Sequence, residues 1–153
     1  MIFSPRGINL FIFIKLPSAW WSGVRVTQLN NTLCEVKVRL NWFNKNPFRS
    51  MFWAVQGMAA ELTTGVLIML AAKKQKCKVS MLVLNNKASF MKKAKGKITF
   101  TCTDVALVEN QFKKLLKSES GARFWMESEG IDQQGNVVSR FRFEWSLKAR
   151  SKA

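Results

Sequence analysis

The chain has 153 residues, 48% hydrophobic and 22% charged, which is the composition of one globular domain and excludes an extended disordered protein. Its 25 Lys and Arg against 9 Asp and Glu give a formal charge of +16 that attracts polyanions, yet no zinc-finger spacing, ribonucleoprotein aromatic motif or basic helix before heptads favours a nucleic-acid domain. Because the chain contains no histidine, Ser-His and Cys-His dyads and His-bearing metal sites are excluded.

The first predicted element lies in residues 1–22, where the apolar run Ile8–Ile14 is followed at once by Lys15. This run is too short to span a bilayer, and no small-residue cleavage pattern follows it. We therefore expect a short amphipathic helix that packs on the domain. A main domain at residues 23–148 and a basic tail at residues 149–153 are expected to follow.

Two runs with a period of two come next, Gly23–Leu29 and Cys34–Leu40, and both predict strands. The Asn30-Asn31-Thr32 segment between them supplies the turn residues of a hairpin, whose valines face a core and whose charged residues face solvent. Widely spaced cysteines, odd in number, fit reduced thiols in a cytoplasmic protein: Cys34, Cys77 and Cys102.

A polar loop leads to the longest predicted element, a helix from Ser50 to Ala72 with Ser50 as its N-cap. The stretch is long enough to cross a membrane, but Glu61 at its middle would cost about 2.5–3.5 kcal/mol there. We therefore expect no transmembrane segment. The helix should make about six turns at 3.6 residues per turn. Because it is apolar around nearly its whole circumference, a curved sheet should enclose it.

Beyond the helix the pattern returns to strands, predicted at residues 79–90, 96–103, 122–129 and 137–147. Val108, Phe112, Leu115 and Leu116 recur at helical spacing and predict a short amphipathic helix between the second and third of these strands. Turn residues at 131–136 make the last two strands a hairpin. The predicted fold class is α+β, with a long central helix wrapped by a curved antiparallel sheet.

Glu61 is the most informative residue, because it is the only acidic side chain between Glu35 and Asp104. A carboxylate in an apolar helix is desolvated unless it is paired or reaches water. Desolvation raises the pKa toward the range in which a carboxylate acts as a general base near neutral pH. The alternative is a structural carboxylate whose oxygens are bound by neighbouring backbone or threonine groups.

The sequence around this helix carries a second signal. Asn46 is followed by Arg49, by Phe52-Trp53-Ala54 at the start of the helix, and by Ala60-Glu61. The pattern resembles that of hotdog-fold acyl-CoA thioesterases and dehydratases, which have an Asn, a Gly, a His-Gly-Gly and an Ala-Asp or Ala-Glu at these positions. The segment Ser89–Gly96 is similar to the Phe-Leu-Arg-Pro-Ala-x-x-Gly bend of that family, one residue shorter.

The element order from Gly23 to Leu147 also resembles the hotdog fold, and the whole is most similar to an uncharacterised branch of the thioesterase superfamily. The resemblance implies an acyl-thioester hydrolase, or an acyl-thioester-binding protein, that acts as a homodimer or dimer of dimers. Its substrate would be an acyl-CoA or an acyl-carrier thioester. No cofactor is expected apart from coenzyme A as part of the substrate.

The resemblance also implies the site. Glu61 would be the nucleophile or general base, and the first N–H groups of the helix would bind the oxyanion. Thr64 would orient the Glu61 carboxylate, with a helix-packing hydroxyl as the alternative, and Asn46 would position the base, the water or the carbonyl. Lys92 would meet the phosphates of coenzyme A or an acidic carrier surface. The implied substrate-binding residues are Asn46, Phe52, Trp53, Ala54, Thr64 and Lys92.

Two other functions compete with hydrolysis. The first is a non-catalytic lipid- or acyl-carrier-binding hotdog module, in which bulky residues at the helix start close the thioester site and Glu61 is a satisfied core acid. The second is a nucleic-acid-associated protein, which only the charge supports, so no nucleic-acid partner is favoured.

Overall fold

Six antiparallel strands in the order β1-β2-β4-β5-β6-β3 form one sheet in the computed structural model, which describes residues 3–117 and 121–150. The strands are β1 (Arg25–Leu29), β2 (Cys34–Arg39), β3 (Val79–Phe90), β4 (Lys97–Cys102), β5 (Ala122–Ile131) and β6 (Val137–Ala149). The helices are α1 (Pro5–Lys15), α2 (Pro17–Trp21), α3 (Trp53–Lys74) and α4 (Val105–Leu115). All the predicted strands are confirmed.

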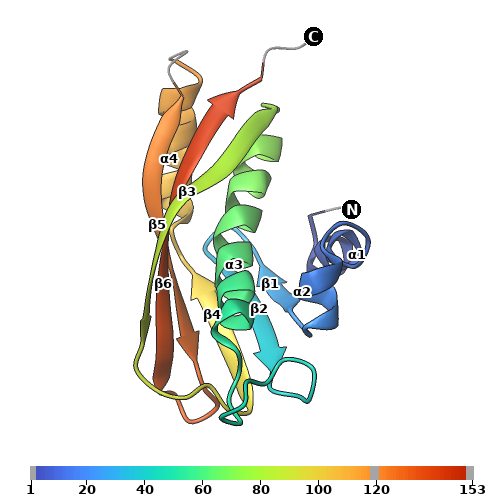
Figure 1. Ribbon diagram of the computed structural model, residues 1–153. Coiled ribbons are helices and arrows are strands. Elements are labelled where there is room, and N and C mark those ends of the chain that lie inside the picture. Colours follow the sequence, from blue (N-terminus) through green and yellow to red (C-terminus); the bar gives the residue numbers. More distant parts are fainter. Residues whose placement is uncertain (1–2, 118–120, 151–153) are drawn as a thin grey trace.

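The sheet curves around α3, which packs against β2, β4, β5 and β6 (Figure 1). This is the predicted hotdog arrangement, an α+β fold with a wrapped central helix. α3 has 22 residues and is apolar enough to cross a membrane, but more than half of its most apolar segment is buried inside the protein. It is the core helix because the sheet covers the apolar surface that a bilayer would otherwise cover.

The start of α3 differs from the prediction. The helix begins at Trp53, and Ser50 is not its N-cap. Residues 46–50 form a tight turn in which the Asn46 N–H donates to the Ser50 carbonyl at 2.8 Å. The Met51 N–H then donates to Ala94 at 2.9 Å, so these residues pair with neighbouring loops before the helix starts.

The predicted N-terminal helix is present as two helices, because Pro17 disfavours the helical conformation in the residue before it. Ile8 and Ile12 bury the inner side of α1. Asn9 binds the backbone of Val26 twice: its Oδ1 accepts from the N–H at 2.9 Å and its Nδ2 donates to the carbonyl at 2.8 Å. These bonds fix α1 on β1 and satisfy polar groups of an edge strand.

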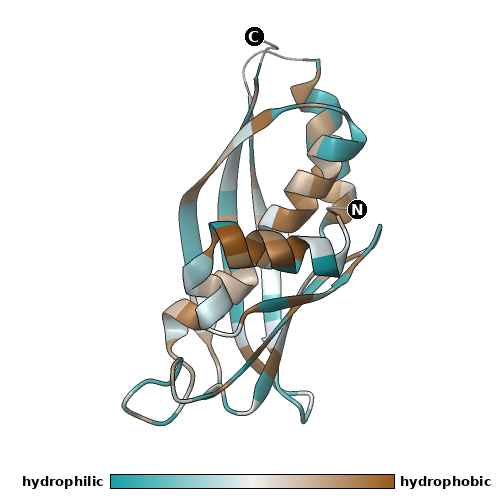
Figure 2. Cartoon of the chain, turned by 90° about the vertical axis from the view of Figure 1, so that its right-hand side faces the viewer, coloured by the Kyte–Doolittle hydropathy of each residue, from teal (hydrophilic) through white to brown (hydrophobic). Residues whose placement is uncertain are grey.

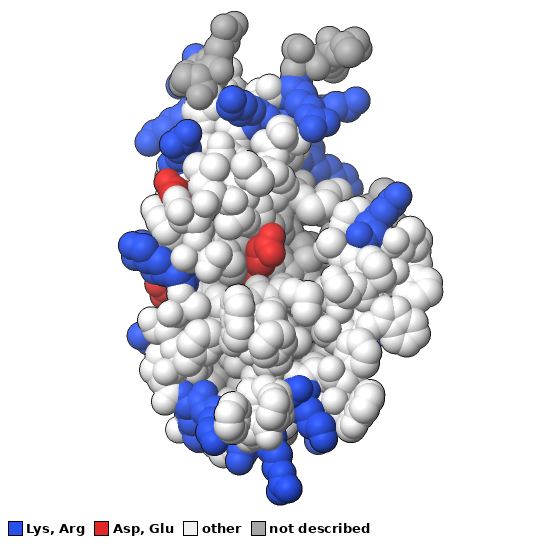
Figure 3. Space-filling model, viewed as in Figure 1, with Lys and Arg blue, Asp and Glu red and all other residues white. Residues whose placement is uncertain are grey.

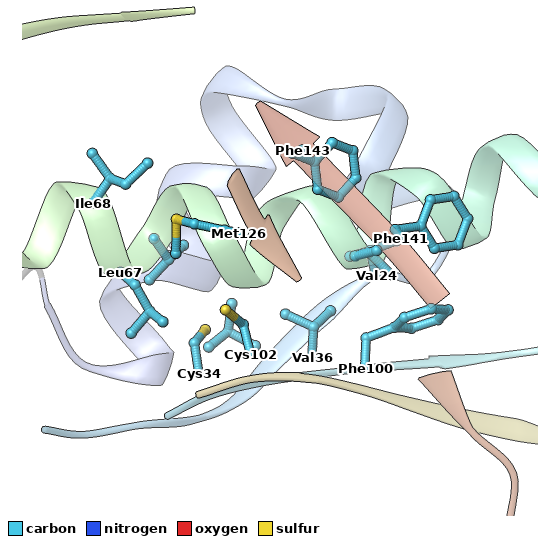
Figure 4. Packing of buried hydrophobic residues seen from close by; sticks show 14 of the residues in the cluster. Val24, Cys34, Val36, Leu67, Ile68, Phe100, Cys102, Met126, Phe141 and Phe143 are labelled. Atoms are coloured by element: carbon cyan, nitrogen blue, oxygen red, sulfur yellow. The ribbon is translucent and has the colours of Figure 1, made fainter. Parts of the chain in front are cut away.

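The core lies between α3 and the concave face of the sheet, where aliphatic, aromatic and sulfur-containing side chains meet (Figure 4). Phe100 and Phe141 are fully buried, with ring centroids 6.2 Å apart. Phe141 also stacks on Phe143 at 6.0 Å, with an interplanar angle of 7°.

Cys34 and Cys102 oppose each other across β2 and β4, and both are buried free thiols. Burial raises the pKa of Cys34 to about 12 and also raises the pKa of Cys102. A thiol with a raised pKa holds little thiolate at neutral pH, so neither is a nucleophile. Both are core residues.

Both ends of the sheet are edge strands. β3 pairs with β6 along its length and has no strand on its other side among the described residues. β6 extends to Ala149, the first residue of the predicted basic tail, and the Arg150 N–H donates to the Lys78 carbonyl at 2.8 Å. The rest of the predicted tail, residues 151–153, lies outside the described residues.

Candidate active site

α3 contains one acidic residue, Glu61, which lines a cavity of about 420 Å3. We call this cavity the Glu61 pocket. The side chain is exposed to solvent at its rim. The surface over α3 is largely uncharged around an acidic side chain, with cations gathered toward the two ends of the molecule (Figure 3). α1 and α2 of the same chain roof this cavity.

The walls of the Glu61 pocket are apolar and come from the N-terminal helices, α3 and the β3–β6 edge of the sheet. Methionines contribute on two of these sides, and their unbranched side chains adapt to flexible apolar ligands. The larger apolar side chains that line the pocket are Phe11, Leu16, Met58, Leu62, Met69, Met81 and Trp145. The shape and lining of the pocket suit an acyl chain that ends beside the carboxylate.

Desolvation raises the pKa of Glu61, as the sequence predicts. Among the described residues, no ion pair or side-chain hydrogen bond reaches its carboxylate. The described residues therefore do not bind the Glu61 carboxylate in the way that the structural alternative requires. No three His, Cys, Asp or Glu side chains of the described residues lie close enough to hold a metal ion.

Thr64 does not orient the Glu61 carboxylate. It is buried, and its hydroxyl donates to the backbone carbonyl of Glu61 at 2.8 Å. The same oxygen accepts a hydrogen bond from Trp145 Nε1 at 3.0 Å. The second bond joins α3 to β6, so Thr64 is the helix-packing hydroxyl of the alternative prediction. Although Thr64 lies one turn after Glu61, its side chain faces the sheet and not the Glu61 carboxylate.

A second cavity, of about 570 Å3, lies where the loop before α3 meets the segment after β3. We call it the helix-start pocket. It brings together Asn46, Phe52, Trp53 and Lys92, four of the predicted substrate-binding residues. Ala54 is half-buried in the first turn of α3 and lines neither pocket.

Asn46 shapes the loop at this pocket. Its Oδ1 accepts from the Phe48 N–H at 2.9 Å and from the Ser50 N–H at 3.2 Å, and its Nδ2 donates to Ser50 Oγ at 3.0 Å. Arg49 has a φ of 59°, in the left-handed region that favours glycine. Glycine is the residue that the resemblance places there, so the backbone of the motif is kept although the side chain differs. A contact of Asn46 with substrate stays a prediction.

The N–H groups at the start of α3 are not equivalent. The Phe52 N–H donates to the Asn44 carbonyl at 2.9 Å and is occupied. The N–H groups of Trp53 and Ala54 have no backbone acceptor among the described residues. The first N–H groups of a helix bind anions through these free donors and the helix dipole. Of the three N–H groups predicted to bind the oxyanion, that of Phe52 is occupied, and oxyanion binding by Trp53 and Ala54 stays a prediction.

Lys92 and Lys93 supply positive charge to the helix-start pocket. Lys92 also forms an ion pair with Asp132, whose Oδ2 lies 3.1 Å from its Nζ. The ion pair leaves Lys93 as the less neutralised of the two cations. Both residues are exposed, so a phosphate can reach them.

One protomer does not bring the two pockets together. Trp53 and Glu61 are eight residues apart in α3, which corresponds to about 12 Å along the helix axis at 1.5 Å per residue. A thioester carbonyl beside Glu61 therefore cannot touch the N–H groups at the start of the same helix. Of the residues predicted as one site, Glu61 lines one pocket, Asn46, Phe52, Trp53 and Lys92 line the other, and Ala54 and Thr64 line neither.

Sequence reasoning missed Gln56 as a site residue. It is buried beside the helix-start pocket, where its Oε1 accepts from Ser139 Oγ at 2.8 Å and its Nε2 donates to the Met51 carbonyl at 3.3 Å. The signal was a second polar residue within an apolar helix, one turn after Phe52. Gln56 joins the helix start to β6 and holds this pocket in shape.

A family model described as "Domain of unknown function (DUF4442)" matches residues 6–147. No protein of curated function matches the chain. A solved structure from Pseudomonas aeruginosa, described as a protein of unknown function and probable thioesterase, has 19% identity and a TM-score of 0.81, covering 96% of this chain and 97% of that one.

Two other solved structures show the same arrangement. A protein of unknown function from Chlorobaculum tepidum TLS has 14% identity and a TM-score of 0.81, over 97% of this chain and 98% of that one. A thioesterase from Haemophilus influenzae has 12% identity and a TM-score of 0.67, over 95% of this chain and 91% of that one. At these identities the likeness establishes the fold.

Proposed function

The chain belongs to the DUF4442 family, and from the geometry of its two pockets we propose that it is an acyl-thioester hydrolase with acyl-CoA or a carrier-bound acyl group as substrate. One observation carries the proposal. Glu61 has a raised pKa, its carboxylate has no ion-pair or side-chain hydrogen-bond partner among the described residues, and it lines an apolar cavity of about 420 Å3. A cavity of this kind holds an acyl chain, and such a carboxylate can remove a proton from water near neutral pH.

In the proposed reaction Glu61 accepts a proton from a water molecule as the water oxygen attacks the thioester carbonyl carbon. The carbonyl oxygen gains the negative charge, and the free N–H groups of Trp53 and Ala54 stabilise it. The tetrahedral intermediate then collapses, the C–S bond breaks, and the thiolate of coenzyme A or the carrier takes up the proton. The products are a fatty acid and a free thiol.

Because Glu61 and the helix start lie about 12 Å apart along α3, we infer that the N–H donors come from a second copy of the chain. We propose a homodimer in which each Glu61 faces the helix start of the partner. The open edge of β3 offers backbone groups for pairing two sheets. The helix-start pocket would then receive the coenzyme A arm, and the Glu61 pocket the acyl chain.

The alternative function is an acyl-binding module without hydrolysis. Phe52 and Trp53 favour it, because their rings pack edge to face at 6.0 Å at the mouth of the helix-start pocket. The two functions are separated by a screen of acyl-CoA substrates of different chain lengths with thiol release as readout. Release of free coenzyme A supports hydrolysis. No release from any acyl-CoA or acyl-carrier substrate, with lipid still bound, would support the binding module.

Substitutions at Gly65 test whether the acyl chain binds in the Glu61 pocket. It lies in the middle of α3, where glycine is about 1 kcal/mol less favourable than alanine, and it lines the Glu61 pocket. A Cβ there would meet the Trp145 ring at 3.6 Å, an ordinary contact. We expect Gly65→Leu to fill the pocket and shift the preferred substrate to shorter acyl chains, measured as kcat/KM against chain length.

Gly65→Ala is the matched control, because it adds one carbon without filling the cavity. It should keep the chain-length preference and raise the melting temperature. An unchanged preference in Gly65→Leu, with the fold intact, would place the acyl chain elsewhere.

Substitutions at Lys92 and Lys93 test whether the helix-start pocket binds the phosphates of coenzyme A. We expect the double variant Lys92→Glu/Lys93→Glu to raise KM for acyl-CoA about tenfold, equivalent to about 1.4 kcal/mol, with little change in kcat. Phosphate contacts of this kind act in the ground state and are screened within about 8 Å at physiological salt, so the effect should shrink as salt is added. Steady-state kinetics at two salt concentrations measures it.

Lys113→Glu/Lys114→Glu on α4 changes the net charge equally and serves as the control. A similar rise of KM in this control would assign the effect to the overall charge of the protein. The local phosphate site would then be rejected.

A further inference from the structure

The outer side of α1, the end of α2 and the tip of the loop between β2 and α3 expose large apolar residues. The exposed fractions are 59% for Leu10, 60% for Ile14, 66% for Trp21, 80% for Trp42 and 61% for Phe43. These residues do not pack in the core. We call them the apolar outer face. A contiguous exposed apolar surface on a folded protein marks an interaction site.

The structure links these residues into one surface. The Phe13 ring packs against Trp20 at 5.1 Å, which connects α1 to α2. Asn44 Nδ2 donates to the Ser22 carbonyl at 2.9 Å, which connects the end of α2 to the loop beside Phe43. Both helices and this loop lie on the right-hand side in Figure 1. Figure 2 shows that side, with the hydrophobic α1 turned toward the viewer.

Hydrogen bonds made by polar side chains of the loop hold its aromatic side chains outward. Asn44 is buried, and besides Ser22 it binds the Arg39 carbonyl at 2.9 Å and the Asn41 N–H at 2.9 Å. The Asn41 Oδ1 in turn accepts from the Phe43 N–H at 2.8 Å. The Asn44 side chain therefore points inward while Trp42 and Phe43 point outward.

The positive charge around the apolar outer face favours an anionic partner. Residues 1–60 contain seven basic side chains and a single acidic one, Glu35, which is paired with Lys37. Arg6, Lys15 and Lys45 lie on the elements that form the face, and all three are exposed. A second copy would bring like charges together, whereas an anionic lipid surface neutralises them.

We propose that the apolar outer face docks the protein on the surface of an anionic lipid bilayer. Trp and Phe side chains insert at the headgroup level, and lysine and arginine pair with lipid phosphates, as in other proteins that lie on a membrane without crossing it. The inner side of the same helices roofs the Glu61 pocket, so docking places that pocket beside the bilayer. The proposal does not depend on hydrolysis, because docking is measured without substrate.

Sedimentation with lipid vesicles tests the proposal. We expect the full chain to pellet with vesicles of phosphatidylcholine containing phosphatidylserine, to pellet far less with phosphatidylcholine alone, and to be released as salt is added. Trp42→Ser/Phe43→Ser should weaken the partition coefficient about tenfold, and Leu10→Ser/Ile14→Ser should do the same from the helix. All four side chains are exposed, so the variants should keep the wild-type melting temperature.

Leu116→Ser is the matched control. Leu116 is 51% exposed at the end of α4 and lies outside the apolar outer face. It should bind vesicles like the wild type. Wild-type protein that stays in solution with anionic vesicles, or full binding by both double variants, would overturn the proposal. A loss of self-association in these variants, without a loss of vesicle binding, would assign the face to a second copy.

Discussion

Replacing Glu61 with glutamine is expected to lower kcat for thioester hydrolysis by about 100- to 10,000-fold, the usual contribution of a general base. The amide keeps the shape and polarity of the carboxyl group but cannot accept the proton of water. Binding of a non-hydrolysable acyl-CoA analogue should stay nearly unchanged, because the apolar walls of the pocket hold the chain. Thiol release gives the rate, and calorimetry gives the affinity.

The pH dependence separates a catalytic carboxylate from a structural one. Desolvation raises the pKa of Glu61, so in the wild type kcat/KM should rise with pH through that raised pKa, above the ordinary carboxyl range. The residual activity of Glu61→Gln should lack this rise. Equal rates in the variant and the wild type across this range would reject Glu61 as the base.

The raised pKa of Glu61 also makes the stability of the folded protein depend on pH. The direction of this dependence is opposite to that caused by a salt-bridged acid. Because the raised pKa belongs to the folded state, the unfolded chain ionises first as pH rises, and stability falls between the unfolded and folded pKa values. Glu61→Gln does not titrate. Its melting temperature relative to the wild type should therefore increase with pH through that window, which also shows that the variant is folded.

Phe141→Ala should cause the largest loss of stability among the single changes discussed. The ring is fully buried on β6 and contacts Phe100 and Phe143 at centroid distances of 6.2 and 6.0 Å. Removing it leaves a cavity between α3 and the sheet, and such truncations cost about 3–5 kcal/mol. The free energy of unfolding from urea titration measures the loss.

Phe90→Ala provides the comparison, because Phe90 packs on Phe141 at 5.6 Å but is 50% exposed. Its loss should be clearly smaller, since less apolar area returns to water. Equal losses in the two variants would contradict the expectation that the more deeply buried ring contributes more to stability.

Local patterns in the sequence were sufficient for the elements and for the fold. The alternation in β1 and β2, the hairpin of β5 and β6, and the uninterrupted apolar length of α3 each reflect one local rule of side-chain direction. A helix apolar on all sides has to be enclosed, which predicts a sheet wrapped around it, and the hotdog fold is what the resemblance to that family adds. Glu61 stands out for the same reason, because a single acid in such a helix is conspicuous in the sequence.

The predicted start of the long helix is wrong because contacts from elsewhere in the chain set it. Ser50 has the chemistry of an N-cap, but the Met51 N–H binds Ala94 and the Phe52 N–H binds Asn44, which delays the helix to Trp53. Local sequence contains no sign of these partners. The predicted role of Thr64 is also wrong. Its hydroxyl donates to the backbone carbonyl of Glu61 and accepts from Trp145, on a distant strand, so it does not donate to the Glu61 carboxylate.

The sequence alone therefore predicts the enclosed core helix, the resemblance to the hotdog family and the unusual position of Glu61. It does not predict that α1 and α2 roof the Glu61 pocket, or that Asn46, Trp53 and Lys92 gather at a different one. These arrangements depend on elements that lie far apart in the chain. Periodicity reports the direction of a side chain relative to its own element, whereas a pocket forms where elements far apart in sequence fail to fill the space between them.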